Sequence, residues 1–189
     1  SYMNIPLAHL QGGEVTGSID EKVRHAITKL SDIHFVSTNR SKKFVIKMGE
    51  NKNLVHNTGC PSLDIINEKK LKNRKSAELD NVKKNLLFKD YIVVVQHPVT
   101  NEIAETNNQI NNTLSAVVEI CKKMKISVAW LWPNVDAGTD IISKKLRIFQ
   151  NNHKEKKKIV FVKNLSPEDY LSLIYNSKCI VGNSSSGIR

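Results

Sequence analysis

The run YIVVVQ at residues 91–96 is the strongest β-strand signal in the sequence. It is apolar throughout instead of alternating, which is typical of a parallel strand with both faces covered. Residues 107–124 then carry apolar side chains at three- and four-residue steps, the pattern of a helix that packs one side against a sheet. The two signals together predict a helix-covered parallel sheet.

Working outward from this run, strands and helices alternate along the whole chain. Strands are expected at residues 5–10, 34–37, 54–57, 91–96, 127–131, 159–162 and 179–181, the first of them buried. Helices are expected at residues 19–31, 39–48, 62–67, 78–87, 107–124 and 139–151, and from residue 167 onward, with Thr38, Ser62 and Ser166 as N-caps. This order predicts an α/β fold of Rossmann-like parallel sheets with right-handed crossovers.

The stretch HLQGGEVTGSIDEKVRH at residues 9–25 concentrates the most chemistry. Gly12 and Gly13 let the chain turn sharply after the first strand. Ser18, three residues before Glu21, has the spacing of a capping box and predicts a helix start near residue 19.

The side chains around this helix start have two interpretations. Asp20, Arg24, His25 and the preceding Glu14 are suited to an α/β active site at a strand end. Alternatively, the acids only complement the helix dipole and Arg24 is an ordinary i,i+4 partner of Asp20. The residues alone leave both open.

Three further motifs follow strands, where open α/β sheets bind ligands. They begin at His97, at the loop of Asn134 and Asp136, and at GNSSSG, residues 182–187. Of the three motifs, GNSSSG is the one that the residues alone best support as a ligand site, because small residues before a helix start expose N–H groups and hydroxyls to an anion. It lacks the lysine of a Walker A loop. Plain loops and turns would account for the composition of all three.

The sequence resembles the hydrolysing UDP-N-acetylglucosamine 2-epimerases of sialic- and legionaminic-acid biosynthesis. The matching motifs, in the order of that family, are HLQGGEVTGSIDEKVRHAITKLSD from residue 9, TGCPSLD from residue 58, QHPVTNE from residue 96, WPNVDAG from residue 132 and GNSSSGIR from residue 182. The resemblance implies a two-lobed glycosyltransferase-B fold, with residues 1–62 the second half of the first lobe and residues 63–189 most of the second, UDP-binding lobe. It also implies an internal fragment, inactive by itself, of an enzyme that is oligomeric when full length.

By this resemblance the enzyme removes the sugar C2 proton, expels UDP to give a glycal-like intermediate, and adds water to yield UDP and a free N-acetylmannosamine-type sugar. Asp20 matches a position important for activity and is the first choice for the acid/base role. Arg24 and His25 are expected to orient it or to bind substrate. The resemblance also implies a set of residues that bind the nucleotide-sugar substrate: His97, Asn134, Ser184, Ser185 and Gly187.

Gln11 departs from the family pattern. Many members have a catalytic glutamate here, in HIEGGE, and glutamine cannot act as a general base. Glu14, the second glutamate of the motif, is the candidate to compensate. Two options stay open: a different acid/base set, used for instance on a 2,4-diacetamido-2,4,6-trideoxy sugar, or impaired chemistry.

Composition limits the other function classes. The formal net charge of +11 permits nucleic-acid binding. The lysines nevertheless lie in polar connectors such as residues 69–75 and 154–158 without interleaved aromatics, which favours a solvated surface and no nucleic-acid partner.

No apolar run has the length of a membrane span, so no membrane partner is expected. The three cysteines show no CxxC spacing, which predicts buried thiols in a soluble cytoplasmic protein. No cofactor and no metal are expected.

The hypothesis of a hydrolysing UDP-sugar 2-epimerase has two alternatives. One is the non-hydrolysing 2-epimerase, which retains UDP on the sugar. The motifs GGEVTG and GNSSSG match the hydrolysing branch of the family more closely. The other is a non-catalytic nucleotide-sugar or nucleic-acid binding module, suggested by Gln11 and the basic charge.

Overall fold

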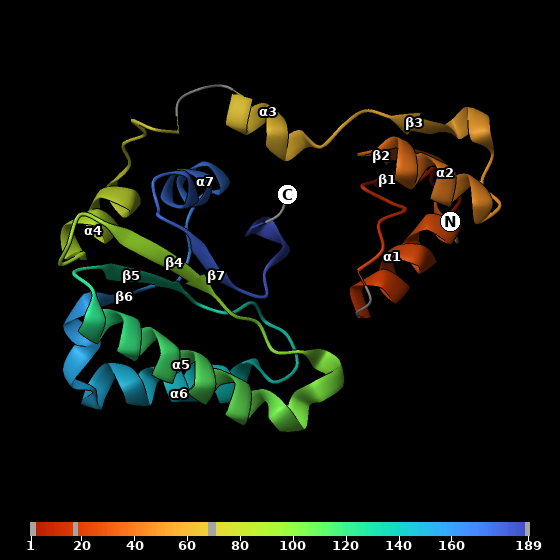
Figure 1. Cartoon of the computed structure of the whole chain (residues 1–189). Coiled ribbons are helices and arrows are strands. Elements are labelled where there is room, and N and C mark those ends of the chain that lie inside the picture. The colour runs from red at the N-terminus through yellow and green to blue at the C-terminus, as the bar shows by residue number, and fades with distance from the viewer. Residues whose placement is uncertain (1–2, 17–18, 68–70, 188–189) are drawn as a thin grey trace. The chain divides into compact units, whose positions relative to one another are not determined.

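The computed structural model describes residues 3–16, 19–67 and 71–187 (Figure 1). The chain divides into two compact units, Ser1–Glu68 and Lys69–Arg189. Each unit contains its own parallel sheet with helices, so the predicted α/β class with parallel sheets is confirmed.

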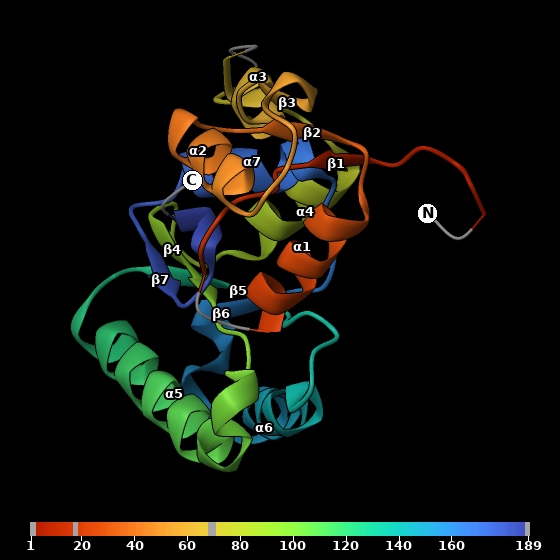
Figure 2. The same cartoon turned by 90° about the vertical axis from the view of Figure 1, so that its right-hand side faces the viewer.

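The sheet of the first unit has three parallel strands in the order β1-β2-β3. Its elements are β1 (Ala8–Leu10), α1 (Ile19–Leu30), β2 (Ile33–Val36), α2 (Asn39–Lys47), the 3₁₀ helix η1 (Lys52–Leu54), β3 (Val55–Asn57) and α3 (Pro61–Asn67). Because the strands follow one another in sequence order, right-handed crossovers put α1 and α2 on the same side of the sheet. Figure 2 shows this unit from a second side.

The prediction of a buried first strand over residues 5–10 is wrong in length and in burial. Only Ala8–Leu10 forms the strand, and Ile5, Leu7 and Leu10 are exposed. The reason is that both crossover helices cover one face, against which His9, Val36 and Val55 are buried. Among the described residues of this unit, no helix packs on the other face.

The sheet of the second unit has four parallel strands in the order β6-β5-β4-β7. Its elements are α4 (Ala77–Asn85), β4 (Tyr91–Val95), η2 (Thr100–Glu105), α5 (Thr106–Lys123), β5 (Ser127–Leu131), α6 (Thr139–Asn152), η3 (Lys154–Lys158), β6 (Ile159–Val162), α7 (Pro167–Tyr175), β7 (Ile180–Gly182) and η4 (Ser185–Gly187). Helices α5 and α6 cover one face of the sheet and α4 and α7 the other (Figure 1).

Strand β4 confirms the prediction of a strand covered on both faces, because all five of its residues are buried. Ile92 and Val94 point into the core beneath α5 and α6. Tyr91, Val93 and Val95 point the other way, into the core beneath α4 and α7. This central strand therefore joins two apolar layers, and its carboxyl end is fixed between them.

Two of the expected N-caps are confirmed and one is wrong. The hydroxyls of Thr38 and Ser166 accept the N–H groups of Ser41 and Asp169 at the starts of α2 and α7. Ser62 is not a cap, because α3 already begins at Pro61, a residue suited to the first helical turn. The predicted cap Ser18 lies outside the described residues.

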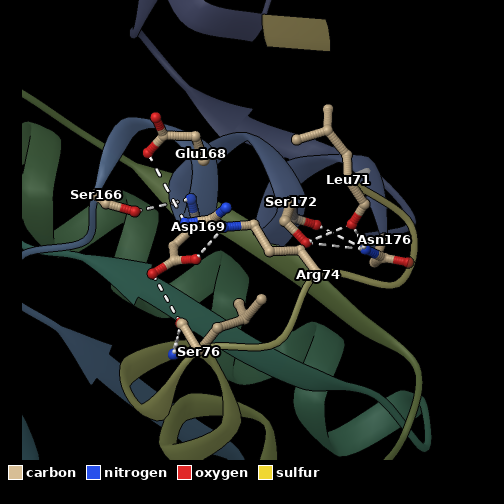
Figure 3. A network of polar contacts seen from close by, with 9 residues as sticks. Leu71, Arg74, Ser76, Ser166, Glu168, Asp169, Ser172 and Asn176 are labelled. Carbon is tan, nitrogen blue, oxygen red and sulfur yellow. Dashed lines mark hydrogen bonds and ion pairs between the residues drawn. The ribbon is translucent and has the colours of Figure 1, made fainter. Parts of the chain in front are cut away.

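A polar network ties the segment before α4 to α7 (Figure 3). The carboxylate of Asp169 accepts from Nε of Arg74 at 2.5 Å and from the hydroxyl of Ser76 at 2.7 Å. The Ser172 hydroxyl donates to the carbonyl of Leu71 at 2.7 Å. Burial by itself would raise the pKa of Asp169. The hydrogen bonds that Asp169 makes with Arg74, Ser76 and Ser166, together with the charge of Arg74, outweigh burial and hold the pKa below its ordinary value.

The three cysteines are free thiols with different exposure. Cys121 is buried and Cys60 half-buried, whereas Cys179 is exposed, so the expectation of buried thiols is wrong for Cys179. Among the residues that the structure describes, no helix is long and apolar enough to cross a membrane.

Candidate functional site

The strand order of the second unit reverses at β4, and at the carboxyl end of such a strand a ligand crevice is expected, which we call the crevice below. The chain runs from β4 to β5 and β6 in one direction and then returns to form β7 on the other side of β4. Ligands of open α/β sheets bind at such a reversal, beyond the carboxyl ends of the strands. His97, two residues after β4, and Asn183, directly after β7, lie on its two sides.

Asn183 joins the two sides. Its side-chain oxygen accepts the main-chain N–H of His97 at 2.8 Å, and its side-chain NH₂ donates to the carbonyl of His97 at 2.9 Å. The main-chain N–H of Asn183 donates to the carbonyl of Val95 at 3.2 Å. The backbone of His97 is therefore fixed by a residue 86 positions later in the chain.

The imidazole of His97 is oriented by the third loop of the crevice. Its Nδ1 accepts the main-chain N–H of Asn134 at 3.3 Å. Burial lowers the pKa of His97 below its ordinary value, and the charge of Asp136 only partly opposes this shift. A neutral ring that accepts at Nδ1 carries its proton on Nε2, so His97 presents one N–H donor at the crevice.

The loop of Asn134 and Asp136 is closed by Thr139, the first residue of α6. The Thr139 hydroxyl donates to the carbonyl of Asn134 at 2.5 Å and accepts the N–H of Asp136 at 3.1 Å. The side chain of Asn134 stays exposed. The loop thus leads directly into a helix N-terminus, whose free N–H groups favour anions.

The serine loop begins with Gly182, which has a φ of 139°. A Cβ atom on this residue would lie 1.7 Å from the carbonyl oxygen of Val95, so only glycine permits this close approach of β7 and β4. Beyond it, the hydroxyls of Ser184 and Ser186 are 2.7 Å apart, and Ser186 also contacts the hydroxyl of Tyr170 from α7.

The other predicted members of this loop lie one turn further on. Ser185 and Gly187 are exposed in η4, and the N–H of Gly187 donates to the carbonyl of Ser184 at 3.4 Å. The structure therefore gathers His97, Asn134 and the serine loop at the carboxyl ends of β4, β5 and β7.

The first unit has a second polar group at the carboxyl end of its own sheet. Gln11 follows β1 with a φ of 62°, and its main-chain N–H donates to the carbonyl of Phe35 at 2.8 Å. Its side-chain NH₂ donates to Sγ of Cys60, 3.6 Å away in the loop after β3. The Gln11 side chain is thus directed across the end of β2, and Cys60 is a neighbour that the sequence did not indicate.

The loop between β1 and α1 is held by Arg24. Its guanidinium donates to the carbonyl of Glu14 at 2.9 Å and to the hydroxyl of Thr16 at 3.3 Å. Glu21 accepts the main-chain N–H of Thr16 at 2.7 Å and lies 3.7 Å from Nε2 of His25. The contacts of Arg24 and His25 therefore shape the loop.

Asp20 lies in the exposed first turn of α1, next to this arrangement. Glu14 is half-buried in the loop itself. Both carboxylates thus lie on the same loop and helix start at the carboxyl end of β1.

The buried His9 packs against the loop between β1 and α1. Nδ1 of His9 lies 3.1 Å from the hydroxyl of Thr28, which itself donates to the carbonyl of Arg24 at 3.0 Å. A Cβ on Gly12 would approach Nδ1 of His9 to 2.9 Å, so the loop packs directly on this ring. Burial, followed by the charges of His34 and Arg24, lowers the pKa of His9.

Four residues with structural roles at these sites are not among the site residues predicted from the sequence. They are Asn183, Thr139, Tyr170 and Ser186. Asn183 stands inside the quoted GNSSSG motif, and its position directly after a strand was a usable signal. Tyr170 had no such signal, because its contact depends on the packing of α7.

Among the described residues, no group of three or more His, Cys, Asp or Glu side chains is arranged to hold a metal ion.

Comparison with known proteins identifies the family of this chain. The family model described as UDP-N-acetylglucosamine 2-epimerase matches residues 1–189. The chain belongs to the UDP-N-acetylglucosamine 2-epimerase family. The resemblance seen in the sequence motifs is thereby confirmed at the level of the family.

Several curated relatives of this chain are named for polysialic acid biosynthesis or as hydrolysing 2-epimerases. Polysialic acid biosynthesis protein P7 of Escherichia coli is 38% identical over 189 residues, which are 100% of this chain and 46% of that protein. The hydrolysing UDP-N,N'-diacetylbacillosamine 2-epimerase of Legionella pneumophila is 33% identical, over 99% of this chain and 47% of that protein. The chain thus spans about half the length of these relatives.

Solved structures share the fold of the chain. UDP-GlcNAc 2-epimerase of Methanocaldococcus jannaschii, in complex with UDP-GlcNAc and UDP, matches with a TM-score of 0.70 at 16% identity, over 97% of this chain and 50% of that one. UDP-N-acetylglucosamine 2-epimerase of Rickettsia bellii matches with a TM-score of 0.66 at 21% identity, over 98% and 47%. These likenesses concern the fold alone.

Proposed function

We propose that the chain is part of a hydrolysing 2-epimerase that converts a UDP-N-acetylglucosamine-type sugar to UDP and a free N-acetylmannosamine-type sugar. The observation that carries this proposal is the crevice between β4 and β7, where the N–H donor of His97 and the serine loop lie beside one another. Membership of the epimerase family and the hydrolysing relatives at 33% and 34% identity support it.

The second unit would hold the nucleotide. Nε2–H of His97, the exposed Asn134 and the loop of Ser184, Ser185 and Gly187 offer donors to a diphosphate. Such donors favour cleavage of the bond between C1 and the diphosphate, because they stabilise the charge that develops on the leaving group. The two units would then correspond to the later part of a first lobe and most of a second lobe.

The first unit would supply the proton chemistry. A carboxylate, for which Asp20 is our first choice, takes the C2 proton as the C1–O bond to UDP breaks, leaving a C1–C2 double bond. Water then gives its hydroxyl to C1, and C2 regains a proton on the opposite face. Glu14 is the second carboxylate on this loop.

Gln11 would act as a hydrogen-bonding group and not as a base. Its amide contacts Cys60 at 3.6 Å, and an amide has no accessible proton-accepting state near neutral pH. The hydroxyl and amide substituents of the sugar are suitable partners for its free carbonyl oxygen. The presence of an amide at this position agrees with a substrate that carries a second acetamido group.

The test is an incubation of the full-length protein with UDP-N-acetylglucosamine and, separately, with UDP-N,N'-diacetylbacillosamine in D₂O. We expect UDP and a free manno-configured sugar in equal amounts, with one deuterium at C2. A nucleotide-linked manno sugar as the stable product would instead identify a non-hydrolysing enzyme. Binding of UDP without turnover of either substrate would leave a binding module.

A further inference from the structure

The amino-terminal edge of the second sheet gathers segments from four parts of the chain. Residues 83–90, 122–125 and 154–158 lead into β4, β5 and β6, on the left of that unit in Figure 1. Lys178 precedes β7, and its main-chain N–H donates to the carbonyl of Tyr91 at 2.9 Å. The N–H of Phe88 donates to the hydroxyl of Ser127 at 2.8 Å, and Nζ of Lys158 donates to the carbonyl of Cys121 at 2.6 Å. These bonds place the segments side by side.

Lysine is concentrated at this edge. Eleven of the eighteen lysines of residues 69–189 lie here, and we call them the lysine edge: Lys83, Lys84, Lys89, Lys122, Lys123, Lys125, Lys154, Lys156, Lys157, Lys158 and Lys178. The loops at the opposite, carboxyl edge of the same sheet contain only Lys163. Two nearby carboxylates are paired, Glu119 with Lys123 at 2.7 Å and Asp90 with Lys178 at 3.2 Å.

Apolar side chains project among these lysines. Leu87 and Met124 are each 56% exposed, in the two adjoining loops before β4 and β5. Next to Lys122 and Lys123, a groove of about 780 Å³ opens between α5 and α6, with the nearly buried Leu114 and Phe149 in its floor. The surface is thus basic and apolar together.

We propose that the lysine edge docks the protein on membrane surfaces rich in anionic phospholipids. Lysines near an anionic bilayer add their attraction to the surface potential, while Leu87 and Met124 enter the interface. This chemistry fits better than nucleic acid, because the segments of the edge contain no arginine to pair with bases and no aromatic side chain is among the large exposed apolar groups there. The crevice at the opposite edge would stay open to substrate.

Surface docking differs from the sequence-based expectation of no membrane partner. That expectation rested on the lack of a spanning segment, and peripheral binding needs none. It also differs from a general effect of the +11 charge, because the lysines are concentrated on one side of one unit.

The experiment is co-sedimentation of the full-length protein with phosphatidylcholine vesicles that contain either no or about 30% phosphatidylglycerol. We expect pelleting only with the anionic vesicles. Replacing Lys122, Lys125 and Lys157 by Gln should weaken the partition about 100-fold, since each lysine contributes about fivefold. The matched control replaces Lys43, Lys47 and Lys52 by Gln, which also removes three positive charges but leaves the lysine edge intact.

A second pair of variants tests the apolar contribution at constant charge. Leu87→Ser with Met124→Ser should weaken vesicle binding several-fold, whereas Leu54→Ser with Leu63→Ser, on exposed residues of the first unit, should not. Equal losses in both lysine triples would overturn the proposal in favour of net charge alone. Binding of a single-stranded RNA oligonucleotide without binding of anionic vesicles would overturn it in favour of a nucleic-acid surface.

Discussion

Asn183 bonds to both main-chain polar groups of His97, accepting its N–H at 2.8 Å and donating to its carbonyl at 2.9 Å. One side chain therefore bridges the ends of β4 and β7 on the two sides of the crevice. Among the described residues, the Asn183 side chain bonds to His97 alone, so its role is to position His97.

Replacing Asn183 by Ala should weaken UDP binding by up to about 30-fold while the fold is kept. Both hydrogen bonds to His97 are lost, and each contributes about 1 kcal/mol. Asn183→Asp should give a larger loss, because a carboxylate cannot donate to the carbonyl of His97 and adds a negative charge beside the proposed diphosphate site. Isothermal titration with UDP on the full-length protein measures both effects.

The matched control for this prediction is Asn85→Ala. The Asn85 amide contacts only Asn81, its neighbour on α4, away from the crevice. UDP affinity should not change in this variant. If Asn183→Ala also binds UDP with unchanged affinity, the bridge has no part in positioning the ligand.

The His97 ring should titrate below the ordinary value of 6.5, because burial disfavours its charged form. Asp136 opposes the shift, so Asp136→Asn should lower the pKa of His97 further. The unfolded chain binds this proton more readily, so the contribution of His97 to stability is present above pH 6.5 and is lost as the pH falls through the lowered pKa. NMR titration of the His97 ring proton measures the shift, and a midpoint at or above 6.5 would contradict it.

Most elements were predictable from sequence because their signals are local. Strands β5 and β6 occur at the expected residues, and the caps of Thr38 and Ser166 depend on groups three residues away. The exposure of Leu10 was not predictable in this way. It depends on which face of the sheet the crossover helices cover, a property of the whole unit.

The sequence could predict where the candidate site residues lie relative to the strands, but not which contacts they make with one another. His97 and Asn134 were placed correctly after their strands, since ligand sites of α/β sheets follow strand ends. Their mutual hydrogen bond depends on the pairing of β4 with β5. The contact of Ser186 with Tyr170 joins the serine loop to α7. Such contacts arise only once helices pack on the sheet, so sequence spacing does not reveal them.

Asp169→Asn should lower the free energy of unfolding by about 2 kcal/mol. The buried carboxylate accepts from Arg74 and Ser76, and removing its charge leaves the guanidinium without its main partner. Glu168→Gln is the matched control, because that exposed carboxylate lies 3.9 Å from Arg74 and should contribute less than about 0.5 kcal/mol. Urea unfolding at pH 7 compares the two variants, and equal losses would contradict the assignment.

Acidification should reproduce part of the Asp169→Asn effect in the unmodified chain. The pKa of Asp169 is held below its ordinary value of 3.8, so its stabilisation is complete above that value and is lost as the pH falls through the lowered pKa. The Asn variant lacks this titration and should show a smaller fall in stability between pH 5 and pH 2. Parallel pH slopes for the two proteins would assign acid sensitivity to other groups.

Asp20→Asn should reduce kcat of the full-length protein by about 10² to 10⁴, the usual contribution of a positioned acid or base. The affinity for UDP should not change, because the nucleotide contacts are proposed for the second unit. Asp64→Asn, on an exposed position of α3, is the control and should leave kcat unchanged. Loss of deuterium incorporation at C2 together with kcat would assign Asp20 to proton transfer. Unchanged turnover would move that role to Glu14, which the same assay tests with Glu14→Gln.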